Sequence, residues 1–84
     1  MTVEEALAAV VRDDWGRLAS TLLSQFRRLD LVDDALGDAV EAAALAWPRD
    51  GVPGNPAGWV FTAARRRILD RLRAEAVAAR RIPN

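Results

Sequence analysis

The chain has 84 residues, contains neither Cys nor His, and carries a formal net charge of zero. This length provides one domain with a small core, because only about 60% of the unfolded surface is buried at this size. A hydrophobic content of 51% is typical of a globular protein rather than a disordered one. No apolar run approaches the roughly 18 residues of a membrane span, so the sequence predicts a cytoplasmic protein without disulfides or membrane contact.

The zero net charge conceals an uneven distribution. Residues 1–50 contain ten acids and five arginines, whereas residues 51–84 contain seven arginines and two acids. Two surfaces with different partners would produce this separation, and the basic one would accept an anion. Codon usage that favours Arg, combined with a basic helix end, would produce it as well.

Few residues suited to catalysis are present. The absence of His, Cys, Lys and Tyr removes most general bases, covalent nucleophiles and nitrogen ligands for metals. The acids that could form a metal or acid–base cluster are Asp33, Asp34, Asp38 and Glu41. Their spacing places them along one exposed helix face, which favours a solvated stripe. The sequence therefore predicts no enzyme, no catalytic residue, no metal site and no cofactor.

The first thirty residues indicate one or two helices. Thr2 and Glu5 form a capping-box pattern, which predicts a helix start. Asp13 and Asp14 either cap a second helix or mark a bend in a continuous one. Apolar residues then recur at three- and four-residue steps, which predicts an amphipathic helix to about Arg28.

A third helix is expected between Asp30, which offers an N-cap, and Pro48, which would stop the helix. Its apolar stripe consists of Leu36, Val40, Ala43 and Trp47. Trp47 and Trp15 are each in phase with the apolar stripe of their helix, so both are expected in the core.

The segment WPRDGVPGNPAGW, Trp47–Trp59, interrupts the helical pattern. It holds three of the four prolines and three of the five glycines, whereas a plain helix connector needs only about 2–8 residues. Asn55 as N-cap and Pro56 at the first helical position then predict a last helix, which extends to about Arg81. No strand pattern competes, so the predicted fold is all-α, a compact bundle of three to four helices.

Helical spacing divides this last helix into two faces. The face expected to meet the bundle contains Val60, Phe61, Ala64, Ile68 and Leu72, and the opposite face contains Trp59, Thr62, Ala63, Arg66, Asp70 and Arg73. An indole that stacks on a base, beside guanidinium groups that hold phosphates, is typical of single-stranded nucleic-acid binding. Alternatively, Trp59 folds back over the loop and covers the end of the bundle.

The stretch DDALGDAVEAAALAWPRDGVPGNPAGWVFTAARRRILDRLR resembles the second conserved region of sigma factors of the extracytoplasmic-function type. That region binds bacterial RNA polymerase and opens the promoter. The resemblance covers about residues 3–73 and includes the WPRDGVP-x-NP loop and the D-R-L-R close. It implies one region 2 domain over residues 1–84, with 74–84 as the start of a linker to an absent C-terminal domain.

The resemblance implies two contact surfaces. The acidic third helix would dock on the clamp helices of the polymerase β′ subunit through Asp33, Asp34, Gly37, Asp38 and Glu41. The loop would receive a base flipped out of the single-stranded non-template minus-ten element. DNA contacts would come from Asn55, Trp59, Thr62, Arg65, Arg66, Arg67, Asp70, Arg71 and Arg73. Gly37 replaces the family's usual Gln and Arg66 its usual Asn. An anti-sigma or regulatory protein is a further candidate partner.

Flipping a base costs a few kcal/mol, so a loop stiffened by proline would form the receiving pocket in advance. Two other hypotheses use the same residues. In the first, the protein is a free-standing helical module whose Arg-rich last helix lies in the major groove of a duplex. In the second, it is an interaction domain that occupies the polymerase clamp or an anti-sigma partner without melting DNA.

Overall fold

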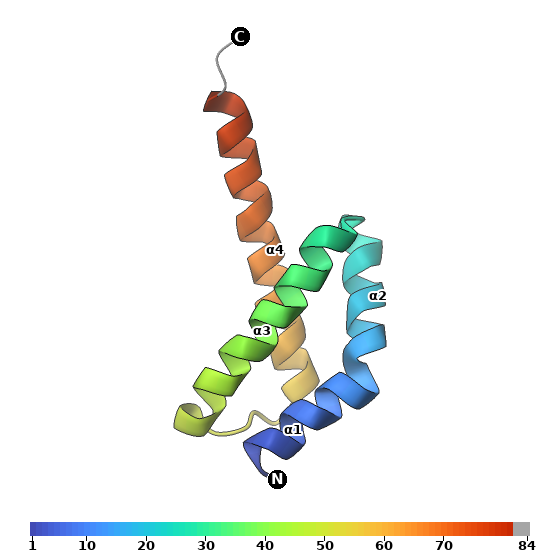
Figure 1. Cartoon of the computed structure of the whole chain (residues 1–84), viewed down its shortest axis with the longest axis vertical. Coiled ribbons are helices and arrows are strands. Elements are labelled where there is room, and N and C mark those ends of the chain that lie inside the picture. Colours follow the sequence, from blue (N-terminus) through green and yellow to red (C-terminus); the bar gives the residue numbers. More distant parts are fainter. Residues whose placement is uncertain (82–84) are drawn as a thin grey trace.

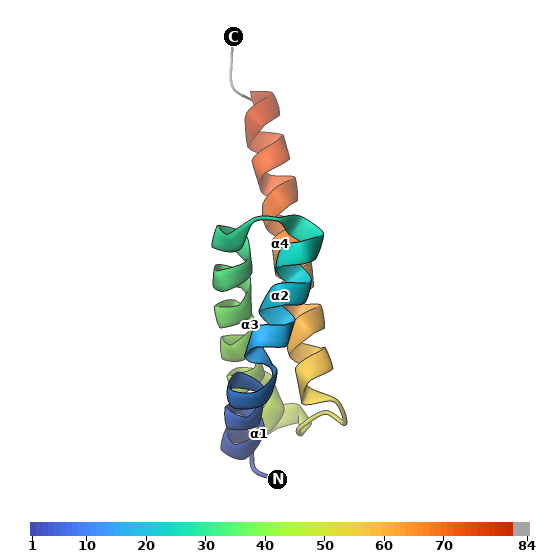
Figure 2. The same cartoon turned by 90° about the vertical axis from the view of Figure 1, so that its right-hand side faces the viewer.

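The computed structural model describes residues 1–81. They form α1 (Val3–Ala9), η1 (Val10–Asp14), α2 (Trp15–Phe26), α3 (Leu29–Asp50) and α4 (Pro56–Arg81), in which η1 is a π-helical segment. This described part of the chain contains no strand, so the predicted all-α bundle is confirmed. The helices α2, α3 and α4 pack against one another, as Figure 1 and Figure 2 show, and α1 lies below them near the α3–α4 loop.

The N-terminal helix begins as predicted. The Thr2 hydroxyl accepts a hydrogen bond from the Glu5 amide at 3.1 Å, and the Glu5 carboxylate accepts one from the Thr2 amide at 3.3 Å. Further along, no side chain caps the start of α2 at Asp14. The wider turns of η1 join α1 to α2, so the two adjacent aspartates mark a bend in a continuous helical segment.

The predicted N-cap of α3 at Asp30 is wrong. Arg28 is the N-cap residue, and α3 begins at Leu29 because Arg27, with a φ of 55°, reverses the chain earlier than expected. Asp30 lies in the first turn, where its carboxylate accepts hydrogen bonds from the Arg28 guanidinium. Its negative charge still suits the positive end of the helix dipole.

The predicted stop of α3 at Pro48 is also wrong, because the helix continues to Asp50. A proline in the last turn removes one backbone hydrogen bond but has a φ that suits a helix. The helix ends at Gly51 instead, whose φ of 94° is readily available to glycine and whose amide donates to the Trp47 carbonyl at 2.8 Å.

The core lies where α2, α3 and α4 meet, and α1 and η1 add Ala6 and Val10 to it. Its larger members are Leu18, Leu22, Leu31, Val32, Leu36, Trp47, Val60 and Ile68. Trp47 is buried as predicted, whereas Trp15 and Val40 pack against the core only in part. Trp15 lies at the junction of η1 and α2, at the margin of this core.

The predicted bundle-facing side of α4 is confirmed. Val60, Ala64 and Ile68 are buried, and Phe61 and Leu72 are partly buried against the core. Beyond Leu72 the helix leaves the bundle, and residues 73–81 are exposed (Figure 1). Among residues 1–81, none of the helices is both long and apolar enough to cross a membrane.

Candidate functional site

Two indole rings lie at the α3–α4 loop. Trp47 is buried near the end of α3, and Trp59 lies in the first turn of α4. The ring centroids are 5.5 Å apart and the planes meet at 75°, an edge-to-face contact. Trp59 therefore packs on the bundle end, as the second interpretation of this residue expects. It also remains partly exposed, so the contact leaves part of its surface accessible.

The predicted N-cap of α4 is confirmed and depends on a neighbouring glycine. The Asn55 Oδ1 accepts a hydrogen bond from the Gly58 amide at 3.0 Å. A Cβ atom on Gly58 would lie 2.6 Å from Asn55 Nδ2 and 2.9 Å from its Cγ. The amide therefore lies directly against the Gly58 backbone, where only glycine leaves room for it. Because Oδ1 is used in the cap, Nδ2 remains as the donor of this side chain.

An open hollow of about 620 Å³ lies beside the loop. Its lining consists of Pro53, Asn55, Gly58, Trp59, Thr62, Ala63 and Arg66. A second hollow, of about 420 Å³, continues along α4 and is lined by Thr62, Arg65, Arg66, Leu69, Asp70 and Arg73. Thr62 and Arg66 border both hollows, so seven of the nine residues predicted to contact DNA lie along one continuous surface.

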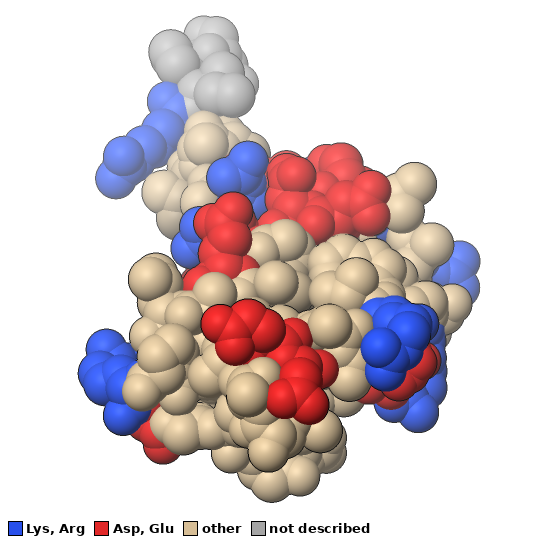
Figure 3. Space-filling model, turned by 60° about the horizontal axis from the view of Figure 1, so that its bottom comes forward, with Lys and Arg blue, Asp and Glu red and all other residues tan. Residues whose placement is uncertain are grey.

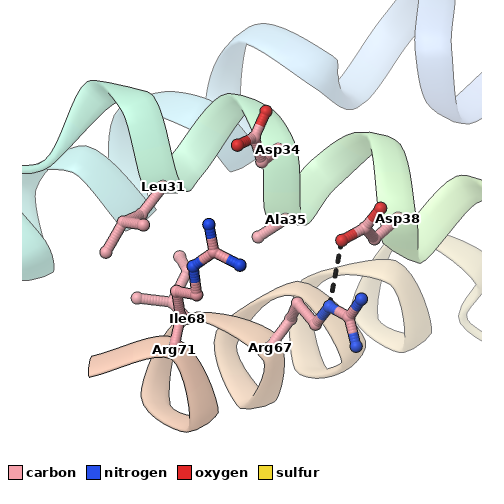
Figure 4. Close-up of a pocket in the computed structure, with 7 residues that line it drawn as sticks. All are labelled: Leu31, Asp34, Ala35, Asp38, Arg67, Ile68 and Arg71. Atoms are coloured by element: carbon pink, nitrogen blue, oxygen red, sulfur yellow. Dashed lines mark hydrogen bonds and ion pairs between the residues drawn. The ribbon is translucent and has the colours of Figure 1, made fainter. Parts of the chain in front are cut away.

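The other two predicted DNA contacts, Arg67 and Arg71, lie on a different side of α4. The Arg67 Nε donates to the Asp38 Oδ2 at 2.9 Å, which joins α4 to α3. Figure 4 shows the Arg71 guanidinium extending toward α3, into the space between Leu31 and Asp34. The structure therefore places both arginines beside residues that the resemblance assigns to polymerase.

Only some of the predicted polymerase-binding residues are exposed to solvent. Asp33, Asp34 and Glu41 are exposed, whereas Gly37 and Asp38 are half-buried. A third hollow lies between α3 and α4, and its lining includes Asp38, Glu41, Leu45, Trp59, Arg66 and Arg67. The acidic and basic surfaces therefore meet at this hollow. On one face of the molecule, Figure 3 shows acidic side chains across the middle and basic side chains toward the edges.

Two features of this region were not predicted from the sequence. Leu45 borders the third hollow and is 78% exposed, so it adds an apolar side chain beside the charged residues that line this surface. Its position outside the apolar stripe of α3 was a signal that could have been noticed. The role of Gly58 was likewise signalled by its place three residues after the N-cap, where an amide is expected to donate to the cap.

Arg28 connects the start of α3 to the far half of α4. Its Nη2 lies 2.9 Å from the Glu75 Oε1 and 3.1 Å from the Asp30 Oδ2. Hydrogen bonds from this guanidinium hold the pKa of the Glu75 carboxyl below its ordinary value of 4.5 and lower the pKa of Asp30 as well. Within residues 1–81, no group of three or more His, Cys, Asp or Glu side chains is placed to hold a metal ion.

Neither a family profile nor a solved structure matches the chain. An uncharacterized protein of Rhizobium meliloti (strain 1021) is 39% identical to it over 54 residues, which are 64% of this chain. The match covers 13% of the length of that relative. The description of the relative states no activity, so functional interpretation depends on the residues and their arrangement.

Proposed function

We propose that this chain is a promoter-opening domain similar to region 2 of extracytoplasmic-function sigma factors. In this proposal it acts in the cytoplasm, docks on the β′ clamp helices of RNA polymerase and captures a flipped base of the non-template minus-ten element. The observation that carries the proposal is the loop hollow, whose lining includes Trp59, Asn55 and Arg66.

The chemistry of the hollow supports capture of a base. Trp59 offers a partly exposed aromatic ring, and base–aromatic stacking contributes about 1–3 kcal/mol per base. Asn55 Nδ2 can donate to a base edge, and its position is fixed in advance by the cap on Gly58. Arg66 is exposed and makes no ion pair with any residue up to Arg81, so it is available to a phosphate.

The acidic surface of α3 supports docking on a basic partner. Asp33 and Glu41 are exposed, and neither forms a salt bridge with another described residue. Asp38 is already paired with Arg67. Docking should therefore depend more on Asp33 and Glu41 than on Asp38.

The DNA half of the proposal is tested by fluorescence anisotropy with a labelled single-stranded 12-mer and with its duplex. We expect the chain to prefer the single strand. The double variant Arg66→Gln/Arg73→Gln should weaken binding at least tenfold in 50 mM salt, because two phosphate contacts are lost. Arg17→Gln, which removes one exposed arginine from α2, is the single-charge control and should bind normally. A preference for the duplex would instead support the free-standing DNA-binding module.

The polymerase half is tested with a fragment that carries the β′ clamp helices. We expect the chain to bind it and the double variant Asp33→Arg/Glu41→Arg to lose binding. Asp13→Arg is the control, because Asp13 is exposed on η1 outside the acidic surface. No binding by the unaltered chain would remove polymerase from the proposal. Clamp binding without affinity for nucleic acid would support the interaction-only hypothesis.

A further inference from the structure

Four side chains recur at intervals of seven along α4: Trp59, Arg66, Arg73 and Arg80. Seven residues are slightly less than two helical turns, so each step drifts by only about 20° around the axis. The four residues therefore lie within an arc of about 60° and form one stripe along the helix. With a rise of 1.5 Å per residue, the stripe is about 31 Å long.

The first three members of this stripe belong to the two hollows already described. Arg80 lies about two turns further, on the part of α4 that extends beyond the bundle (Figure 1). It is exposed, and within the described range it forms no salt bridge. Arg73 forms an ion pair with Asp70 at 3.3 Å, but its side chain remains 75% exposed.

The charge on this extension is almost entirely positive. Between Arg71 and Arg81 the one acid is Glu75, which lies about half a turn away from the stripe. Arg28 of α3 already pairs with that carboxylate at 2.9 Å. The stripe therefore meets no acidic side chain after Asp70, so Arg66 and Arg80 are unpaired among the described residues and Arg73 has only the exposed Asp70 as a competing partner.

We infer that the stripe Trp59–Arg66–Arg73–Arg80 is a track for single-stranded nucleic acid and that residues 74–81 belong to this binding surface. This inference rests on the proposed function and extends its DNA-binding surface beyond the bundle. Trp59 stacks on a base at one end of the track, and the three arginines contact phosphates at intervals of about 10 Å. The occupant is a nucleic-acid strand because the track combines an aromatic platform with regularly spaced guanidinium groups.

The length of the track makes the inference testable with oligonucleotides of two sizes. Nucleotides in a stacked strand are spaced about 3.4 Å apart, so a strand of about nine would cover the distance from Trp59 to Arg80. A strand of four covers about 14 Å at that spacing, which is less than half of the track. A four-nucleotide strand stacked on Trp59 therefore leaves Arg80 without a phosphate.

The experiment measures anisotropy of fluorescein-labelled dT12 and dT4 between 50 and 200 mM salt. We expect Arg80→Gln to weaken dT12 binding by threefold to tenfold at 50 mM salt and to leave dT4 unchanged. The slope of log affinity against log salt for dT12 should become shallower by about 0.7, the value for one phosphate contact on a single strand. Arg17→Gln removes the same charge from α2 and should leave the affinity and slope for dT12 unchanged.

A second variant tests whether binding depends on the position of the Arg80 charge on the helix or only on the net charge of the chain. Ala78→Arg/Arg80→Ala keeps the net charge and moves the guanidinium about 160° around the helix. Ala and Arg have similar helix propensities, so the helix should persist. We expect this variant to lose dT12 affinity as Arg80→Gln does. Retained affinity in either variant would overturn the track, while dT12 binding by the unaltered chain would leave the proposed function standing. No dT12 binding by the unaltered chain would overturn both.

Discussion

Asp38 and Arg67 are joined across α3 and α4 by a hydrogen-bonded ion pair of 2.9 Å, although the family resemblance assigns them to different partners. Asp38 was expected to face polymerase and Arg67 to face DNA. Their side chains are 43% and 64% exposed, so the pair is accessible and open to competition. A basic partner that engages Asp38 would release Arg67.

We therefore predict that Asp38→Asn increases the affinity for dT12 by about twofold to threefold, because Arg67 becomes available to phosphate and a nearby negative charge is removed. The free energy of unfolding should fall by no more than about 1 kcal/mol, as for other exposed ion pairs. Anisotropy and urea denaturation measure the two effects. Asp33→Asn removes the same charge without breaking a pair, and an equal gain in affinity there would show that net charge alone is responsible.

The register of α3 against α4 explains why this pair escaped prediction. Asp38 faces Arg67, and one helical turn earlier in α3 and one turn later in α4, Asp34 lies on the same side as Arg71 (Figure 4). Helical spacing in the sequence predicts the face of the helix on which each residue lies. The pairing of residues between the helices depends in addition on how the two antiparallel helices are aligned. That alignment is set by burial of residues such as Leu36 and Ile68, which periodicity identifies but does not match with each other.

Local signals predicted the starts of α1 and α4 because their physics involves only a few adjacent residues. The Thr2 capping box and the Asn55 cap are both present. The predictions from Pro48 and Asp30 were wrong because each residue type is compatible both with a helix boundary and with a position inside the helix near its end. A proline is tolerated in a last turn when a glycine ends the helix, and an aspartate suits the first turn as well as the cap.

We predict that Gly58→Ala lowers the free energy of unfolding by up to about 0.5 kcal/mol, because losing the N-cap costs about 1 kcal/mol and the better helix propensity of Ala offsets about 0.5–1 kcal/mol of that cost. The new methyl group would collide with the Asn55 amide, which would have to leave the Gly58 amide. Urea denaturation followed by circular dichroism measures the change. The same substitution should also weaken dT12 binding, because the Asn55 donor is displaced from the loop hollow.

Gly37→Ala is the matched control and should have the opposite sign. Gly37 lies in the interior of α3, and no described atom lies within 4 Å of the position that its Cβ would take. Alanine should therefore stabilise the helix by about 0.5–1 kcal/mol. A stabilising effect at both glycines would show that the close contact at Gly58 relaxes without cost.

The ion pairs of Arg28 predict how the extended part of α4 responds to acid. The pKa of Glu75 is lower in the folded protein than its ordinary value of 4.5. The ionised carboxylate therefore stabilises the fold at pH values above 4.5, and this contribution is lost as the pH falls through the lower pKa of the folded protein. We expect helix content, measured by circular dichroism, to decrease below about pH 4.5. In Glu75→Gln part of this decrease should be absent, and an unchanged acid transition would contradict the assignment.

The Trp47–Trp59 contact determines which variants can test base stacking. Trp59→Ala removes an edge-to-face partner of Trp47, and such pairs contribute about 0.5–1.5 kcal/mol beyond area burial. Lost DNA binding in that variant would therefore be confounded with lost stability.

Trp59→Phe keeps an aromatic ring against Trp47, so we expect its free energy of unfolding to stay within about 1 kcal/mol of that of the unaltered chain. Its dT12 affinity should fall by less than about fivefold. Trp59→Leu keeps an apolar cover but removes the aromatic platform, and it should weaken dT12 binding at least tenfold. Equal binding by the Phe and Leu variants, both folded by circular dichroism, would show that Trp59 serves the bundle alone.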